Sequence, residues 1–180
     1  IPNMELDKQL VERRNRIMAE EGIEFRTGVA VGTDLAAEAL LVENDAVLLA
    51  CGATHPRDLP VPGRDLPGIH FAMEYLHGNT KRLLDRAHGA PTIDARGKRV
   101  VVIGGGDTGN DFIGTAMRHG CAGLVNFELL PKPPVERGPE APWPTYPRLF
   151  KQDYGHQEVQ EVFGRDPREY SILTKEFLGD

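Results

Sequence analysis

The first clear pattern of hydrophobic and polar positions predicts a helix over residues 7–21. Apolar residues recur there at the spacing that places them on one helical stripe, with charged residues opposite. The stripe consists of Leu6, Leu10, Val11, Ile17 and Met18. Gly22 follows, where a left-handed residue commonly ends a helix. A shorter helix is predicted at residues 36–41, and residues 23–31 have the composition of one strand or two short ones.

Three short apolar runs have the composition of buried strands. They lie at residues 46–50, 100–103 and 124–130. A continuous aliphatic run bounded by polar residues or glycine is typical of a parallel strand covered on both faces. Residues 108–119, closed by Gly120, have the pattern of a helix between the last two runs. The order strand, helix, strand predicts an α/β fold, with these two runs parallel in one sheet and the helix crossing between them.

Two proline-rich segments interrupt this pattern. Residues 56–68 contain four prolines and two glycines, and residues 131–147 contain seven of the fourteen prolines. Proline fixes φ and removes an amide donor, so neither segment fits a sheet centre or a helix interior. We expect the first segment to separate two domains and the second to be an irregular, extended excursion. Further helices are predicted around residues 71–76 and over residues 157–178.

Composition and charge exclude several classes of protein. Of the 180 residues, 40% are hydrophobic and 27% are charged, as in ordinary globular proteins. The formal net charge of −6 disfavours nucleic-acid binding, and the apolar runs are too short to cross a bilayer. The chain begins without an initiator methionine or an apolar signal segment. We therefore expect a piece of a longer, cytoplasmic protein.

The cysteines and histidines do not predict a metal site. Cys51 and Cys121 lie seventy positions apart, and no pair among the six histidines has the spacing of metal ligands on a helix. Two thiolates also fall short of the roughly four that ligate an iron–sulfur cubane. Cys51 is expected to be a small buried hydrophobic residue, with a redox thiol as the alternative.

The segment after the second apolar run carries the clearest chemical signal. Gly104, Gly106 and Gly109 have the spacing G-x-G-x-x-G, between a β-branched strand and an amphipathic helix. In a dinucleotide-binding turn, the first glycine permits the tight turn, the second admits a pyrophosphate and the third lets the helix approach the strand. The helix N-terminus also favours anionic phosphates. The predicted nucleotide-binding residues of the turn are Gly104, Gly105, Gly106, Asp107, Thr108 and Gly109. The alternative is a tight turn without a ligand.

Charged residues near the turn bear on the choice between NADH and NADPH. Because a carboxylate would repel a pyrophosphate, Asp107 is expected to turn away and cap the helix. Glu128 lies twenty-four residues after Gly104, where an acid can accept hydrogen bonds from both ribose hydroxyls of NAD. It could instead be a solvated residue at the end of a strand. Lys132 and Arg137 could neutralise the 2′-phosphate of NADP. The sequence favours NADH and leaves NADPH open.

Ala50, Cys51 and Gly52 end the first apolar run and are predicted to let a cofactor approach the backbone. Together with the later glycine turn, this string resembles the flavoprotein reductases with two dinucleotide domains, in which Ala-Thr-Gly ends a strand of the FAD domain. Other strings resemble the small (β) subunit of glutamate synthase, or the corresponding part of a fused chain. They lie at residues 1–4, 61–63, 68–76, 127–134, 142–144 and 150–158. Cys51 replaces the usual threonine, so any hydrogen bond from that hydroxyl is lost.

The resemblance implies Rossmann-like layers from portions of two adjacent nucleotide-binding domains. Residues 1–64 would belong to an FAD domain, and residues 65–180 to an NAD(P)H domain. In this family NAD(P)H reduces FAD, and electrons pass through iron–sulfur clusters to the large (α) subunit or fused domain, where glutamine and 2-oxoglutarate yield glutamate. The FAD glycine turn and the cluster-binding cysteines are not in this chain, so the isolated fragment is expected to be inactive. The alternatives are a non-catalytic Rossmann-like interaction domain and the electron-input module of another flavin and iron–sulfur oxidoreductase.

Overall fold

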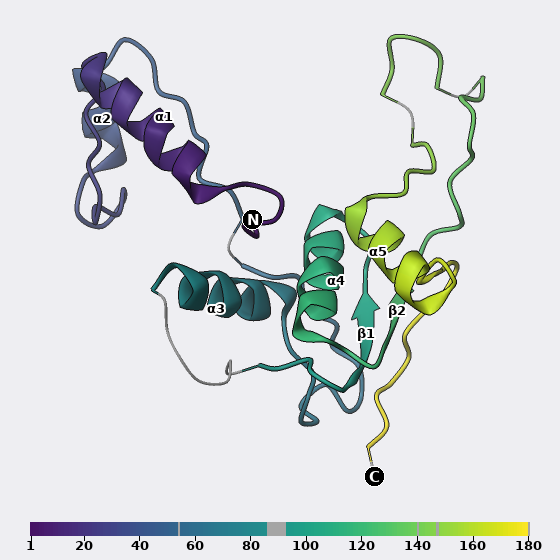
Figure 1. The fold of residues 1–180 in the computed structure, drawn as a ribbon. Helices are drawn as coiled ribbons and strands as arrows, with labels where there is room; N and C mark the ends of the chain where they lie inside the picture. Colours follow the sequence, from purple (N-terminus) through teal and green to yellow (C-terminus); the bar gives the residue numbers. More distant parts are fainter. Residues whose placement is uncertain (54, 86–92, 140, 147, 180) are drawn as a thin grey trace. The chain divides into compact units, whose positions relative to one another are not determined.

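The computed structural model describes residues 1–53, 55–85, 93–139, 141–146 and 148–179 (Figure 1). Its contacts divide the chain into two compact units. The sheet unit consists of Ile1–Glu5 and Asp58–Asp180, and the helical unit consists of Leu6–Arg57. The division falls inside the proline-rich segment at residues 56–68. The assignment of these parts to an FAD domain and an NAD(P)H domain, divided at residue 64, stays a prediction.

A three-stranded parallel sheet of order β1-β2-β3 forms the base of the sheet unit. The strands are β1 (Arg99–Ile103), β2 (Gly123–Phe127) and β3 (Arg168–Glu169). Helix α4 (Asp107–His119) joins β1 to β2, and α5 (Tyr154–Phe163) precedes β3 in the chain. The predicted α/β fold is therefore confirmed, including the parallel pairing of the second and third apolar runs and the helix between them.

The core lies between β1, β2 and the helices around α4. Helix α4 contacts β1, α5 and α3 (Ala72–Leu84), and Figure 1 shows it between these two helices. The buried apolar residues are Tyr75, Leu76, Ala95, Val102, Ile113, Ala116, Cys121, Leu124 and Val159. Val101 and Ile103, by contrast, remain 53% and 46% exposed. The prediction that β1 is buried on both faces is wrong, because only alternate positions of the strand face these helices.

The strands and helices end earlier or later than their composition predicts. β2 ends at Phe127, the last of its residues in register with β1 and β3, and Leu129 and Leu130 beyond it are exposed. α3 is longer than the predicted helix at residues 71–76. The described residues of the segment 131–147 form neither helix nor strand, as expected of a proline-rich segment. Positions 140 and 147 of that segment lie outside the described residues.

The helix predicted over residues 157–178 is wrong beyond Phe163. α5 ends at Phe163, its C-cap Gly164 has a left-handed φ of 80°, and Pro167 follows closely. The chain then forms β3 and an extended segment instead of more helix. Its last part returns to the proline-rich connector, where the amide of Phe177 donates to the carbonyl of Pro62 at 2.8 Å. Close packing there requires Gly63, since a Cβ at this residue would lie 2.1 Å from the carbonyl oxygen of Phe177.

The helical unit contains α1 (Lys8–Glu20) and α2 (Ala37–Glu43). Asp7 caps α1 by accepting a hydrogen bond from the amide of Gln9 at 2.9 Å. Gly22 follows the helix with a φ of 95°, as predicted from its position. Both helices agree with the sequence pattern to within a few residues, because periodicity and capping are properties of the local sequence.

The strands predicted in the helical unit are absent. Residues 23–31 contain only one isolated bridge, between Val31 and Leu35, and residues 46–50 form no strand. Leu48 and Leu49 are 90% and 82% exposed. The predicted buried strand at residues 46–50 is therefore wrong for this chain. A strand is stabilised by pairing with a neighbour, and the described part of the helical unit contains no neighbouring strand for this run.

Candidate functional site

The glycine turn leaves the sheet at the carboxyl end of β1. Gly104 has a φ of 103°, a left-handed conformation that side chains rarely adopt, and its amide still donates to the carbonyl of Phe127 at 2.9 Å. The backbone thus keeps its pairing with β2 for one residue and then reverses sharply. This geometry agrees with the role expected of the first glycine in a dinucleotide-binding turn.

Helix α4 begins at the end of this turn and packs closely on it. Gly106 is the N-cap residue, and its carbonyl accepts from the amide of Gly109 at 2.8 Å. A Cβ at Gly109 would lie 2.8 Å from the carbonyl oxygen of Gly104, so only glycine lets the helix approach the strand this closely. Asp107 does not cap the helix as predicted; it is the first helical residue and is exposed, like Thr108.

Glu128 lies directly against the glycine turn. A Cβ built on Gly105 would fall 1.1 Å from the Oε1 atom of Glu128, so the carboxylate occupies the space above that glycine. Burial raises the pKa of Glu128, and the positive charge of Arg168 opposes this rise. The structure therefore brings Glu128 to the turn that precedes it by more than twenty residues. At Gly106, in contrast, an added Cβ would meet nothing within 4 Å.

Asn126 contacts the same turn from inside the domain, and the sequence reasoning missed it. Its side-chain amide donates to the carbonyl of Val102 at 3.2 Å and to the carbonyl of Gly104 at 2.9 Å. The residue is 0% exposed, and its Oδ1 atom has no hydrogen-bond partner in the part of the chain that the structure describes. The available signal was a polar residue within the apolar run at residues 124–127.

Arg168 is the cation that acts on Glu128, and no motif in the sequence indicated it. Its guanidinium group pairs with both carboxylate oxygens of Asp166, at 2.9 and 2.6 Å, and donates to the carbonyl of Lys151 at 2.6 Å. The group also lies 4.5 Å from the ring centroid of Phe150. Since β3 places Arg168 beside Asn126 of β2, this cation is held at the same edge of the sheet as the glycine turn.

The two residues considered for a 2′-phosphate have other contacts. Arg137 donates to the carbonyls of Ala141 and Thr145, both at 2.7 Å, and thereby holds its own loop in shape. The Nζ atom of Lys132 lies 4.5 Å from the ring centroid of Phe150. Phe150 thus contacts two cations, Lys132 and Arg168. Among the three cations Lys132, Arg137 and Arg168, only Arg168 contributes to the shift in the pKa of Glu128.

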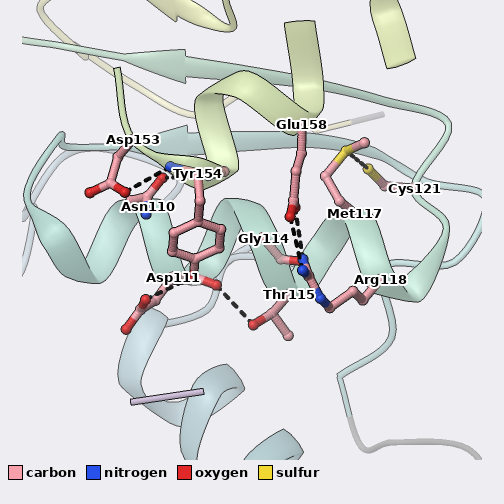
Figure 2. A network of polar contacts seen from close by, with 11 residues as sticks. Asn110, Asp111, Gly114, Thr115, Met117, Arg118, Cys121, Asp153, Tyr154 and Glu158 are labelled. Atoms are coloured by element: carbon pink, nitrogen blue, oxygen red, sulfur yellow. Dashed lines mark hydrogen bonds and ion pairs between the residues drawn. The ribbon is translucent and has the colours of Figure 1, made fainter. Parts of the chain in front are cut away.

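Polar contacts between α4 and α5 fix the helix that carries the turn (Figure 2). The hydroxyl of Tyr154 donates to Asp111 at 2.9 Å, and the amide of Gly155 donates to the side chain of Asn110 at 3.0 Å. Further along α4, Arg118 donates to both carboxylate oxygens of Glu158, at 2.7 and 2.9 Å. The helix N-terminus is therefore part of a well-connected layer.

The remaining predicted site residues lie in the helical unit. Ala50, Cys51 and Gly52 are exposed, so Cys51 is not the buried residue that was expected. Burial raises the pKa of the other thiol, Cys121, which contacts the sulfur of Met117 at 3.8 Å. Among the described residues there is no group of three or more histidine, cysteine or acidic side chains that could hold a metal ion. No described helix is long and apolar enough to cross a membrane.

Comparison with known proteins finds relatives that align with the whole chain. It is 58% identical over 183 residues to "Glutamate synthase [NADH]" of Schizosaccharomyces pombe, covering 100% of this chain and 9% of the relative. It is 45% identical over 181 residues to "Glutamate synthase [NADPH] small chain" of Bacillus subtilis, covering 100% of this chain and 37% of that relative. A weaker relative is "Putative oxidoreductase AegA" of Escherichia coli, 38% identical over 69% of the chain and 19% of its own length.

The family model named pyridine nucleotide-disulphide oxidoreductase matches residues 32–137. That match covers more than half of the chain and includes both the exposed string at residues 50–52 and the entire glycine turn with Glu128. It agrees with the parallel sheet, the left-handed first glycine and the close approach of α4 to β1. The chain belongs to the pyridine nucleotide-disulphide oxidoreductase family and is similar to a segment of the glutamate synthases.

Proposed function

We propose that the sheet unit binds NAD(P)H and that the chain is part of the electron-input portion of a glutamate synthase. The pyrophosphate would lie on Gly104–Gly109 and the adenosine ribose at Glu128. The observation that carries this proposal is the placement of the Glu128 carboxylate directly above Gly105. A hydroxyl-binding acid and a phosphate-binding turn are thereby adjacent, as one dinucleotide requires.

The residues of the turn fit such a nucleotide. Within the described part of the chain, the amides of Gly105 and Gly106 donate no backbone hydrogen bond. They lie at the N-terminus of α4, a helix of 13 residues, where unpaired amides and the helix dipole favour an anion. The space beside Gly106 is open. Asp107 carries an opposing charge but is exposed at the first helical position.

These residues bind and orient the nucleotide. The amides of the turn would donate to phosphate oxygens, and the ionised Glu128 would accept hydrogen bonds from the ribose hydroxyls. A 2′-phosphate placed against Glu128 would bring two anions together, which supports a preference for NADH. The nicotinamide ring, when bound, supplies a hydride for an acceptor. Asn126 and Gly109 keep the turn close to the sheet.

The full reaction of a glutamate synthase needs groups beyond these residues. The string at residues 50–52 is exposed, and no strand of the described part of the chain contains it. Ala50, Cys51 and Gly52 therefore do not form a flavin site by themselves. The chain's two cysteines cannot ligate a cubane cluster. We propose that FAD, iron–sulfur clusters and a large subunit or fused domain complete the cytoplasmic parent protein. The relatives support this view, since the chain spans 9% of the S. pombe protein and 37% of the B. subtilis protein.

Titration of the purified chain with NADH and NADPH tests the proposal. We expect saturable binding, followed by a change in nucleotide fluorescence, with NADH bound at least about tenfold more tightly. That ratio corresponds to the loss of one charge-assisted hydrogen bond. E128A should weaken NADH and narrow its advantage over NADPH. Tighter binding of NADPH by the unmodified chain would refute the role of Glu128, and no binding of either nucleotide would refute the proposed function.

A second candidate function is an electron-input module of another oxidoreductase. The similarity to the E. coli "Putative oxidoreductase AegA" favours it, because a protein without the name of glutamate synthase aligns with 69% of the chain. Both candidates predict nucleotide binding, whereas a non-catalytic interaction domain does not. Reconstitution with a glutamate synthase large subunit separates the two: only the first candidate predicts glutamate formation that depends on NAD(P)H.

A further inference from the structure

Asn126 occupies a position in β2 where an apolar residue would be the simpler choice. Its neighbours Leu124 and Val102 belong to the core, and Asn126 itself is 0% exposed. Burying an amide costs free energy unless its donors and acceptor are paired. Here the two donors are used and the Oδ1 acceptor has no partner among the described residues. The pairing of the two donors is therefore the feature to explain.

One of those donors reaches a carbonyl that lies beyond the end of the strand. β1 ends at Ile103, and the backbone reverses at Gly104, so the Gly104 carbonyl lies past the last paired strand residues. The side chain of Asn126 reaches this carbonyl at 2.9 Å and holds it toward the interior. A side chain at Gly109 would push against the same oxygen from the helix, since its Cβ would lie 2.8 Å away. The carbonyl is therefore confined from both the sheet and the helix.

Confinement of this carbonyl sets the direction of the next amide. The bond between Gly104 and Gly105 is trans, and in a trans peptide the C=O and N–H groups point in opposite directions. With the carbonyl of Gly104 held inward by Asn126, the N–H of Gly105 must point away from the core. The open space at the next residue, Gly106, is where the proposed function places the pyrophosphate, and the Glu128 carboxylate lies against Gly105 on its Cβ side.

We infer that Asn126 is a positioning residue of the nucleotide site, which holds the Gly104–Gly105 peptide so that the Gly105 amide faces the pyrophosphate of a dinucleotide. This inference rests on the proposed function for the ligand, but the hold on the peptide does not. Since NADH and NADPH share the pyrophosphate, Asn126 affects both nucleotides equally, whereas Glu128 distinguishes them by the ribose.

The test compares N126L and N126D with the unmodified 180-residue chain. Leucine has a similar volume and no polar atoms, and aspartate keeps the shape but replaces the donating amino group by an acceptor. T115V is the matched control, because it also removes a buried side-chain hydrogen bond, from Thr115 to the Asp111 carbonyl at 2.8 Å, elsewhere on α4. Each variant is assayed for its affinities for NADH and NADPH, its melting temperature and the NMR signals of the Gly104–Gly106 amides.

Loss of the Asn126 bonds should shift the signals of Gly105 and Gly106 without any nucleotide present. Both nucleotides should bind about tenfold more weakly to N126L and N126D, with an unchanged ratio of the two affinities, since one charge-assisted hydrogen bond is worth about this factor. T115V should retain the signals of Gly105 and Gly106, and its affinities for both nucleotides should stay within about twofold of the original. This should hold even if its melting temperature falls as much as those of the Asn126 variants.

Several results would overturn the inference. Unshifted glycine signals would show that Asn126 does not hold the Gly104–Gly105 peptide. Shifted signals with unchanged affinities would show that the orientation of this peptide does not affect nucleotide binding. A changed ratio of NADH to NADPH affinity would mean that Asn126 acts through Glu128. If both Asn126 variants are unfolded while T115V is folded, Asn126 contributes only to the stability of the fold. If the unmodified chain binds no nucleotide, the proposed function fails, and the glycine signals still decide whether Asn126 holds the turn.

Discussion

Two glycines of the turn, Gly106 and Gly109, have opposite structural requirements. An added Cβ at Gly106 would enter open space, and its φ of −79° is accessible to any residue. An added Cβ at Gly109 would collide with the carbonyl of Gly104. Substitutions at the two positions therefore separate ligand binding from folding, although both lie in one short motif.

G106V should abolish the binding of both nucleotides and lower the free energy of unfolding by no more than about 1 kcal/mol, the cost of a poorer N-cap residue. G109A should instead lower the free energy of unfolding by about 1–3 kcal/mol, the usual effect of overpacking. Thermal melts and nucleotide titrations measure the two effects. Normal NADH binding by G106V would show that the pyrophosphate does not lie on this turn.

Arg168 gives the site a predicted pH dependence. The carboxylate of Glu128 accepts ribose hydroxyls in its ionised form, so NADH affinity should be full above its pKa and fall as the pH drops through it. Burial raises this pKa, and Arg168 opposes the rise. In R168M the loss of NADH affinity should therefore begin at a higher pH, and R168K should restore part of the original profile.

Titrations at a series of pH values with NADH and NADPH check this expectation. NADPH provides the internal control, because its 2′-phosphate is disfavoured by an ionised Glu128. An equal loss of both nucleotides at every pH in R168M would show that the bonds of Arg168 to Asp166 and Lys151 matter only for folding.

At the scale of elements, a partly buried histidine joins α3, α4 and the segment before β1. The Nδ1 atom of His119 accepts from the hydroxyl of Tyr75 at 3.0 Å and from the amide of Ala95 at 3.4 Å. Its Nε2 atom lies 3.0 Å from the side-chain oxygen of Asn79 and donates to it. With Nδ1 accepting from two donors, the neutral ring with the proton on Nε2 fits this arrangement.

Acid should therefore weaken the packing of α3 on α4. Burial lowers the pKa of His119; Arg96 and Arg82 act in the same direction, and Asp94 opposes them. A histidine with a lowered pKa binds fewer protons when folded, so its contribution is present above about pH 6.5 and is lost as the pH falls below that value.

Denaturant unfolding between about pH 7.5 and 5 measures this effect, since that range spans the ordinary histidine pKa. We expect the free energy of unfolding to fall with the pH in the unmodified chain and to fall less in H119Q. His156 provides a residual slope, because burial lowers its pKa as well. An identical slope in H119Q would contradict the role of His119.

The elements that the sequence predicts well are those determined by neighbouring residues. The strand, glycine turn, helix and strand over residues 99–127 follow from apolar runs, glycine spacing and the left-handed Gly120. The run at residues 46–50 was wrong, because a strand depends on a partner that its own composition cannot reveal. β3 was missed for a related reason: it contains two residues, and only the edge of β2 makes them a strand.

The candidate site shows the same division between local and distant information. Gly104, Gly109 and Glu128 could be predicted as site residues because motif spacing relates them along the chain, and their binding role stays a prediction. Asn126 and Arg168 were missed because their roles depend on contacts across the sheet and with distant segments. The expected cap by Asp107 was wrong by one residue, since the helix begins at Asp107 with Gly106 as its N-cap.

At the scale of the whole molecule, the predicted site residues divide between the two units. Gly104–Gly109 and Glu128 belong to the sheet unit, and Ala50, Cys51 and Gly52 belong to the helical unit. A shortened chain of residues 58–180 lacks the helical unit and also Ile1–Glu5 of the sheet unit. Because none of the removed residues belongs to the glycine turn or Glu128, it should bind NADH within about twofold of the full chain. Calorimetric titration of both proteins checks this. A tenfold loss would mean that residues 1–57 contribute to the nucleotide site.

The bond between Phe177 and Pro62 has a consequence for the order in which the protein is made. The main part of the sheet unit begins at Asp58, yet β3 and the segment that returns to the connector come more than a hundred residues later. During synthesis β1, α4 and β2 therefore emerge while the edge of β2 is still unpaired. An uncovered strand edge can pair with other chains. We expect ribosome-stalled chains that end before Arg168 to be cleaved by protease far faster than those that include Phe177.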